Sequence, residues 1–281
     1  MNLHTSPKEQ FRVGTSPNRS DMASLSILKL IACLNLVLIL GGCQTSSQPR
    51  RLTISAASSL QDVLERLEPQ FEARYPQIDL SFNFAASGVL QRQIERGAPV
   101  DLFFSAATQP MERLTQDGWV VPHSRRDLIT NRLVLIVPQH SRRFLDSFEQ
   151  LPSAHIRKIM VGEFSTVPAG QYAQEVLSRS HLLAKVQPKL IFASNVRGVL
   201  AAVASANVDA GIVYQTDAQQ SSQVKQVATA SVLSHSPIVY PIAIVTTSAQ
   251  PQAAQSLINF LSTPTAQQTF TQFGFGRVIK E

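Results

Sequence analysis

Serine residues stand where short apolar runs give way to amphipathic helices in the first half of this chain. Ser58 and Ser59 follow a short β run and precede a helical stripe, and Ser87 follows the strand-like residues 80–84. Ser59 is expected to act as a helix N-cap, with Asp62 three residues later. Hydroxyl groups, the first free backbone N–H groups and the positive end of the helix dipole gather at such junctions. The pattern predicts an anion site that needs neither lysine nor arginine.

The same junction recurs in the second half of the chain. Helices are predicted to start at residues 167–170 (VPAG) and 194–198 (SNVRG), each after an apolar strand, and the buried strand AGIVY ends in Tyr214. Arg197 is the only other ionisable side chain in these turns, and we interpret it as a surface or inter-lobe salt-bridge residue. In three turns a glycine is expected to ease close approach of the backbone to a ligand: Gly88, Gly170 and Gly198.

Carboxylates are scarce in these turns, and their scarcity favours anions that carry no proton. Apart from Asp62, no Asp or Glu lies within them. A protonated oxyanion such as hydrogen phosphate brings an O–H donor that needs an acceptor, whereas a fully ionised oxyanion leaves no donor unpaired. Charge-assisted hydrogen bonds from neutral donors can offset the cost of desolvating a dianion. The residues alone therefore favour molybdate, tungstate or sulfate over phosphate and do not rank the three.

The elements that must position these turns alternate between short apolar strands and helices from about residue 51 onward. This alternation predicts an α/β fold with mostly parallel sheets flanked by helices, in which ligands collect at the carboxyl ends of the strands. We expect two lobes, the first formed by residues 51–132 plus 243–281 and the second by residues 133–242. The ligand cleft is expected between them.

Residues 1–43 have the pattern of an export signal rather than that of a folded domain. An apolar run over residues 27–42 ends in Leu-Gly-Gly before Cys43, which resembles a bacterial lipoprotein signal. We therefore expect residues 1–43 to be a signal peptide with lipidated Cys43, and residues 44–50 to be a tether. The polar front is long for such a signal, which favours Met22 as the translation start.

Composition argues against several classes of function. The net charge is +6, but no run of Lys and Arg with interleaved aromatic residues is present, so no nucleic acid partner is expected. Of the two cysteines, Cys33 lies in the apolar run, so the processed chain could form no internal disulfide. The six histidines include no pair at metal-ligand spacing, which argues against a bare metal cation.

Five fragments of the chain resemble one family closely: AASSLQDVL, FAASGVLQRQIERGAPVDLFFSA, VPAGQYAQEVL, NVRGVLAAV and GIVYQTDA. From about residue 51 to residue 278 the chain is similar to the molybdate-binding periplasmic proteins of bacterial ABC transporters. The resemblance implies a two-lobed periplasmic binding protein of type II topology that is not an enzyme and uses no cofactor. It further implies a monomer at the extracytoplasmic face of a membrane, which delivers molybdate or tungstate to a permease and its ATPase.

The resemblance also implies the residues that contact the oxyanion. They are the hydroxyls of Ser59 and Ser87, the backbone N–H groups of Ala169 and Val196, and the phenol of Tyr214. The chain departs from the family pattern at Asn195, where many relatives carry an acidic residue. It also doubles the serine at Ser58, and the register from Leu60 favours Ser59 as the contact. Because none of the assigned groups titrates in this range, affinity is expected to be flat between about pH 6 and pH 8.

Other functions remain open from sequence. A receptor for sulfate, thiosulfate or phosphate would use the same kind of turn, and titration with each anion discriminates among them. A serine hydrolase is disfavoured because no G-x-S-x-G elbow is present and no histidine lies near a serine turn in sequence. The effector part of a transcription regulator would need an amino-terminal helix-turn-helix, where this chain has the apolar run.

Overall fold

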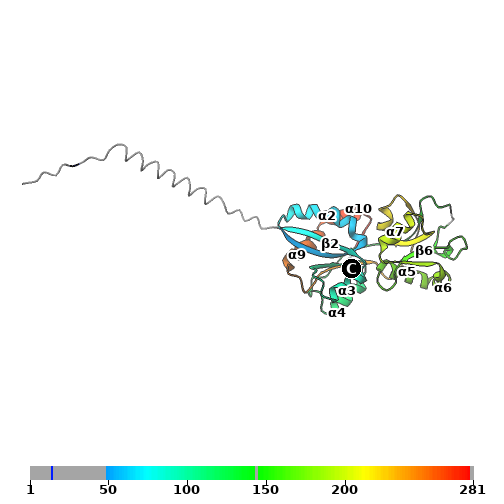
Figure 1. Cartoon of the computed structure of the whole chain (residues 1–281), viewed down its shortest axis with the longest axis horizontal. Coiled ribbons are helices and arrows are strands. Elements are labelled where there is room, and N and C mark those ends of the chain that lie inside the picture. The colour runs from blue at the N-terminus through cyan, green and yellow to red at the C-terminus, as the bar shows by residue number, and fades with distance from the viewer. Residues whose placement is uncertain (1–13, 15–48, 143–144, 279–281) are drawn as a thin grey trace, which may run out of the picture. The chain divides into compact units, whose positions relative to one another are not determined.

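The computed structural model describes residue 14, residues 49–142 and residues 145–278 (Figure 1). Apart from residue 14, the expected signal peptide, including Cys33 and Cys43, lies outside the described residues, as does most of the tether. Residues 49–281 form one compact unit. Within the described part of the chain, no helix combines the length and the apolar character needed to cross a membrane.

A six-stranded sheet with its helices forms what we call lobe 1. Its strand order is β11-β4-β10-β3-β1-β2, in which β1 pairs parallel with β2 and β3, whereas β4, β10 and β11 pair antiparallel. The strands are β1 (Arg50–Ala57), β2 (Ile78–Ala85), β3 (Leu102–Phe104), β4 (Arg126–Thr130), β10 (Val239–Ile244) and β11 (Gly276–Arg277). The helices are η1 (Ser58–Leu60), α2 (Gln61–Arg74), α3 (Ser87–Glu95), α4 (Thr108–Gln116), α9 (Pro251–Leu261) and α10 (Pro264–Gln272).

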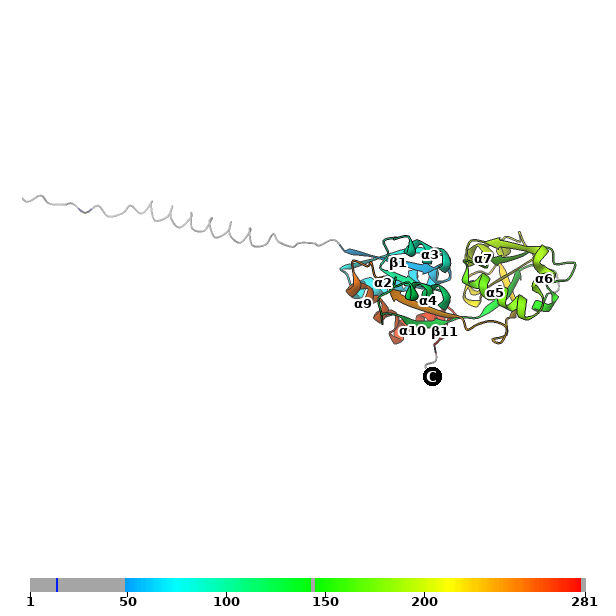
Figure 2. The same cartoon turned by 90° about the horizontal axis from the view of Figure 1, so that it is seen from below.

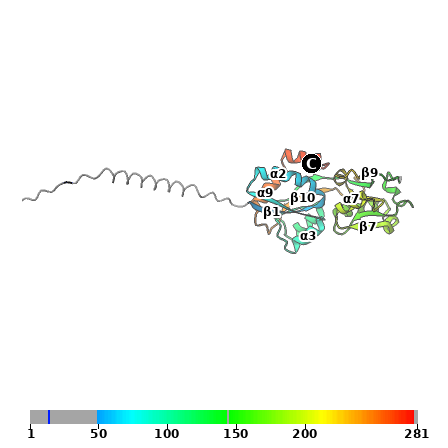
Figure 3. The ribbon, with the colours of Figure 1, turned by 45° about the horizontal axis from the view of Figure 1, so that its top comes forward.

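Helices cover both faces of this sheet. In β3, Phe103 packs with side chains of α3 and α4, whereas Leu102 and Phe104 on either side of it belong to the core that contains α2, α9 and α10. Figures 1 and 3 show α2 and α3 on opposite sides of the strands. Successive side chains of a strand point to opposite faces of the sheet. A strand made only of apolar residues is therefore buried on both of its faces.

A five-stranded sheet with its helices forms lobe 2. Its order is β7-β6-β8-β5-β9, with β6 parallel to β7 and β8, and β5 antiparallel to β8 and β9. The strands are β5 (Leu133–Pro138), β6 (Ile159–Gly162), β7 (Leu190–Ala193), β8 (Ala210–Tyr214) and β9 (Val224–Thr229). The helices are η2 (Phe148–Gln150), α5 (Pro168–Arg179), α6 (Leu183–Val186), η3 (Gln187–Lys189), α7 (Val196–Ala204) and α8 (Gln215–Gln219).

The chain passes between the two sheets twice, and these crossings explain the mixed strand directions (Figure 2). It leaves lobe 1 after β4 through residues 131–132 and returns to β10 through residues 230–238. The backbone N–H of Asn131 donates to the carbonyl oxygen of Ile238 at 3.2 Å, which joins the crossings. The α/β class and the flanking helices are as predicted, but both sheets are mixed rather than mostly parallel, because returning strands enter antiparallel. The boundary expected at residues 242–243 falls inside β10.

Candidate functional site

The five residues predicted to contact an anion are all buried at junctions between a strand and a helix. Their exposed fractions are 3% for Ser59, 0% for Ser87, 1% for Ala169, 3% for Val196 and 1% for Tyr214. Ser59 lies in η1 after β1, Ser87 begins α3 after β2, and Tyr214 ends β8. Ala169 and Val196 lie in the first turns of α5 and α7.

Contacts between the lobes bring these junctions together. α7, which begins with Val196, contacts η1 of lobe 1. The N–H of Gly88, next to Ser87, donates to the carbonyl oxygen of Thr166 in the loop before α5, at 3.0 Å. The Tyr214 hydroxyl donates across to the carbonyl oxygen of Ala106 at 3.1 Å. The lobes are therefore closed on each other around this set of residues.

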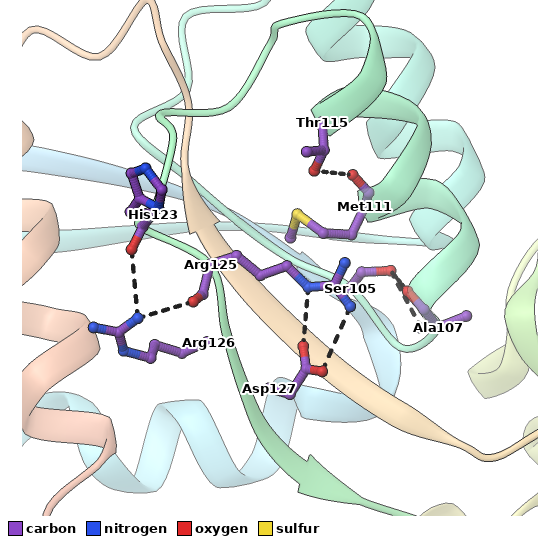
Figure 4. A network of polar contacts seen from close by, with 8 residues as sticks. All are labelled: Ser105, Ala107, Met111, Thr115, His123, Arg125, Arg126 and Asp127. Carbon is purple, nitrogen blue, oxygen red and sulfur yellow. Dashed lines mark hydrogen bonds and ion pairs between the residues drawn. The ribbon is translucent and has the colours of Figure 1, made fainter.

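The two lobe 1 serines each have a defined hydrogen-bond partner. Ser87 Oγ accepts the N–H of Ala106 at 3.0 Å, and Ser59 Oγ lies 3.0 Å from the hydroxyl of Tyr240 in β10. Ala106 is held by the turn in which Ser105 Oγ donates to the Ala107 carbonyl oxygen at 2.7 Å (Figure 4). Neither partner is an imidazole, so these serines lack the general base that a hydrolytic nucleophile requires.

Ser59 does not cap a helix, contrary to the prediction. The chain first forms the 3-10 turn η1, α2 begins at Gln61, and no side chain caps either element. Asp62 instead pairs with Arg197. The physical reason is that Ser59 is buried against Tyr240 from a distant strand, and that tertiary partner outweighs the local capping pattern. The hydroxyl is consequently not committed to the backbone.

The N-termini of the lobe 2 helices supply free backbone donors. The first N–H groups of a helix have no acceptor within it, and Pro168 at the start of α5 has no N–H, so Ala169 carries the first donor there. In α7 the side chain of Asn195 accepts the N–H of Gly198 at 2.9 Å and so acts as the N-cap. Asn195 thereby caps the helix as an acidic residue at this position could, but it adds no negative charge to the site.

Tyr214 is a permanent donor at this site. Burial raises the pKa of its phenol well above the ordinary value, and the neighbouring Tyr240 acts in the same direction. The group therefore keeps its proton throughout the physiological range. In this structure the proton goes to Ala106, so an anion that binds Tyr214 must replace that bond.

A buried carboxylate that the sequence analysis missed lies beside the site. Asp217 in α8 is 0% exposed, and its Oδ1 lies 2.9 Å from Nε of Arg197, whose Nη2 pairs with Asp62 of lobe 1. Burial raises the pKa of Asp217 from 3.8 to about 6, although Arg197 pulls it down. Asp217 follows Tyr214 by three residues in GIVYQTDA, which was the available signal. Arg197 is thus an inter-lobe ion-pair residue, as interpreted, and it balances this negative charge.

The three glycines differ in what a Cβ at each position would meet. A Cβ at Gly170 would lie 2.1 Å from the carbonyl oxygen of Gly162, so this glycine lets α5 pack on β6. A Cβ at Gly88 would lie 2.7 Å from the carbonyl oxygen of Thr166, so this glycine lets the lobes close. A Cβ at Gly198 would meet only ordinary contacts, the nearest at 3.4 Å. Close approach between backbone segments therefore explains why glycine stands at positions 88 and 170.

No group of three or more His, Cys, Asp and Glu side chains that could hold a metal ion occurs in the described ranges 49–142 and 145–278. The site instead presents hydroxyl and N–H donors from both lobes, with one buried carboxylate paired to an arginine. Such a set can hold an anion by hydrogen bonds alone.

Known proteins resemble this chain in sequence and in fold. Residues 52–276 match the family described as bacterial extracellular solute-binding protein. YvgL of Bacillus subtilis (strain 168), named as an ABC transporter substrate-binding lipoprotein, is 39% identical over 87% of this chain and 96% of its own. The molybdate-binding protein ModA of Haemophilus influenzae is 34% identical over 88% and 99%. A Clostridium difficile structure, described as the substrate-binding domain of a molybdenum ABC transporter, is 38% identical over 82% and 99%, with a TM-score of 0.64.

Proposed function

Because this chain belongs to the bacterial extracellular solute-binding proteins, we propose that it binds molybdate and delivers it to the permease and ATPase of an ABC transporter. It is a binding protein, not an enzyme. The observation that carries the proposal is the set of neutral donors from both lobes at one buried place. The names of the relatives ModA and of the molybdenum transporter domain support the choice of anion. Tungstate, which offers the same tetrahedral shape and charge, is the second proposed ligand.

The proposed contacts are the Ser59 and Ser87 hydroxyls in lobe 1 and the Ala169 N–H, the Val196 N–H and the Tyr214 phenol in lobe 2. Each hydrogen bond to a charged group contributes about 1.5–3 kcal/mol. Because this figure is net of the hydrogen bonds to water that are given up, five such bonds in a buried site leave net binding. Ser58, 6% exposed, is the alternative hydroxyl, but Ser59 is the one with a partner from the distant strand β10.

Calorimetric titration of the purified protein with molybdate, tungstate, sulfate and phosphate tests the proposal. We expect molybdate and tungstate to bind most tightly and phosphate to bind least, because no carboxylate stands among the proposed contacts to accept the phosphate proton. A protein that prefers sulfate would be a sulfate receptor of the same fold, and one that binds none of the four would contradict the proposal.

We also propose that the protein is a monomer anchored by a lipid at Cys43, at the extracytoplasmic face of the membrane. The Leu-Gly-Gly-Cys pattern and the lipoprotein name of the relative YvgL support this anchor. Mass spectrometry of the protein purified from membranes tests it, and an unmodified Cys43 behind an intact leader would refute it.

Replacing Tyr214 with phenylalanine is expected to weaken molybdate binding about tenfold or more, with little change in the stability of the ligand-free protein. The ring still packs against Tyr172 and Tyr240, and only the hydroxyl is lost. The bound form loses one charge-assisted hydrogen bond worth about 1.5–3 kcal/mol, which corresponds to a loss of affinity of about tenfold or more. Calorimetry and thermal unfolding measure the two effects, and wild-type affinity would remove Tyr214 from the contact set.

Affinity is expected to be flat from about pH 7 to pH 8 and to rise as the pH falls through about 6, which revises the expectation from sequence. The pKa of Asp217 is already raised to about 6, and a bound anion nearby raises it further. Binding is therefore accompanied by proton uptake, and lower pH favours the bound form. Titrations in two buffers of different protonation enthalpy count these protons. Asp217→Asn is expected to abolish the rise, and an affinity that falls on acidification would contradict the argument.

A further inference from the structure

Three charged side chains form two ion pairs at the boundary between the lobes. Arg197, in the first turn of α7, places Nε 2.9 Å from Oδ1 of Asp217 and pairs through Nη2 with the carboxylate of Asp62. Asp217 belongs to lobe 2, as Arg197 does, whereas Asp62 lies in the first turn of α2 in lobe 1. Arg197 therefore has one partner in its own lobe and one in the other.

The two ion pairs must respond differently when the lobes separate. In a hinge motion each lobe moves as a rigid body, so the pair between Arg197 and Asp217 persists. The pair with Asp62 connects the two bodies. Asp62 lies in the helix that follows β1 and η1, and β3 separates β1 from the crossing strand β10, so Asp62 is not at the hinge. Of the two pairs, opening therefore breaks the one with Asp62.

Arg197 is held ready for Asp62 before the lobes close. Asp217 is 0% exposed and binds the guanidinium from within lobe 2. Because the guanidinium is planar, a bond at Nε also restricts the directions of its other N–H donors. A side chain that is already ordered loses little conformational entropy when it binds a second partner. Closure thus gains an attraction across the boundary at little entropic cost.

The ion pair between Arg197 and Asp62 joins two segments that carry proposed anion contacts. Arg197 directly follows Val196, and Asp62 lies three residues after Ser59. α7 contacts η1 across the boundary at this place. Neither charged side chain is among the proposed contacts. The pair instead keeps the segment of the Ser59 hydroxyl close to the segment of the Val196 N–H.

We propose that Asp62 and Arg197 are positioning residues that latch the lobes together once an anion has bound, and so slow its release. The inference rests on the proposed function. The strength of the pair suits this role. The side chains of Arg197 and Asp62 are 24% and 37% exposed, and pairs at such partly exposed positions change an equilibrium by about fivefold at most. A latch of this size prolongs the closed, loaded form and still allows the release that delivery of a ligand requires.

Asp62→Asn tests the latch in the purified protein, because it removes the charge and keeps the size of the side chain. Release is measured as the loss of labelled molybdate into an excess of unlabelled molybdate, and association as the rate at which the label binds. We expect release to become about fivefold faster without slower association, because the pair forms only after the anion has entered. Added salt should speed release from the wild type more than from the variant, because a partly exposed pair is screened. Asp62→Glu restores the carboxylate and should restore slower release.

Asp117→Asn is the matched control. The Asp117 side chain is also 37% exposed and pairs with Arg113 at 2.9 Å, but both residues belong to lobe 1. Its release rate should equal that of the wild type. A second control uses the double variant Arg197→Met with Asp217→Asn, in which no guanidinium is left for Asp62. A further Asp62→Asn change should leave the release rate of that double variant unaltered.

The outcomes separate the latch from the proposed function. A wild type that binds molybdate, together with an Asp62→Asn variant that releases it at the wild-type rate, overturns the latch alone. Equal acceleration in Asp117→Asn also overturns it, because a general effect of the lost charge is then the cause. The latch is equally wrong if Asp62→Asn speeds release in the absence of Arg197. A wild type that binds no oxyanion overturns the proposed function and the latch together.

Discussion

Replacing Arg197 with methionine is expected to lower the free energy of unfolding by about 2 kcal/mol at pH 7.5, and by much less near pH 5. Asp217 is completely buried, and Arg197 is its ion-pair partner at 2.9 Å. Removal of one member of a buried pair leaves the other as an uncompensated charge. The Arg197 side chain is 24% exposed, so the cost is expected to stay below that of breaking a fully buried pair.

The pH dependence follows from the sign of the pKa shift. Burial raises the pKa of Asp217 above its ordinary value, and Arg197 opposes this rise. Without Arg197 the pKa rises further, so the folded protein holds a proton that the unfolded chain has released. Stability then falls as the pH rises from the ordinary pKa of 3.8 through and beyond about 6. Near pH 5, below the folded pKa of about 6, Asp217 is mostly neutral in both folded proteins, so the missing arginine costs little there.

Urea unfolding of the wild type and the variant near pH 5 and near pH 7.5 measures the effect. The double variant Arg197→Met with Asp217→Asn should recover most of the stability at the higher pH. Arg179→Met is the matched control, because its pair with Glu175 lies at the surface and is worth at most about 1 kcal/mol. A loss that is the same at both pH values, or that the double variant does not reverse, would show that Asp217 is not the cause.

The sequence predicted the strand-to-helix junctions well, because the signal for them is local. The strand-to-helix junctions at Ser59, Ser87, Ala169 and Val196 could be read from apolar periodicity and turn residues. The buried strand end at Tyr214 could be read in the same way. These features depend on neighbours within a few positions, and the structure places them where the pattern indicated.

Partners that are distant in sequence could not be predicted. Tyr240 is 181 positions from Ser59, and Asn131 is 109 positions from Tyr240. No periodicity links such residues, because their contact depends on how the chain crosses between the lobes. The same limit explains the wrong cap assignment at Ser59, where a tertiary bond replaces the local one. Asp217 was within reach in GIVYQTDA, but its burial depends on packing that a single sequence does not show.

Gly88→Ala is expected to weaken molybdate binding at least about a hundredfold while the ligand-free protein stays as stable as the wild type or becomes slightly more stable. Gly88 is the second residue of α3, and alanine favours a helix over glycine by up to about 1 kcal/mol. Within lobe 1 the change is therefore tolerated. Across the cleft, the new Cβ would lie 2.7 Å from the carbonyl oxygen of Thr166 and 3.0 Å from its Cα.

This clash involves backbone atoms, so no side chain can turn away to relieve it, and the lobes must stay apart. An anion held by lobe 1 alone loses the proposed contacts from Ala169, Val196 and Tyr214. Loss of two or more charge-assisted hydrogen bonds corresponds to a hundredfold change or more. Gly198→Ala is the matched control, because it makes the same substitution in the first turn of α7, where the nearest atom is an ordinary 3.4 Å away. Calorimetry should show near wild-type affinity for this control, and X-ray scattering should show ligand-induced compaction in it but not in Gly88→Ala. If Gly88→Ala binds molybdate tightly and compacts like the wild type, closure does not depend on the approach of α3 to Thr166.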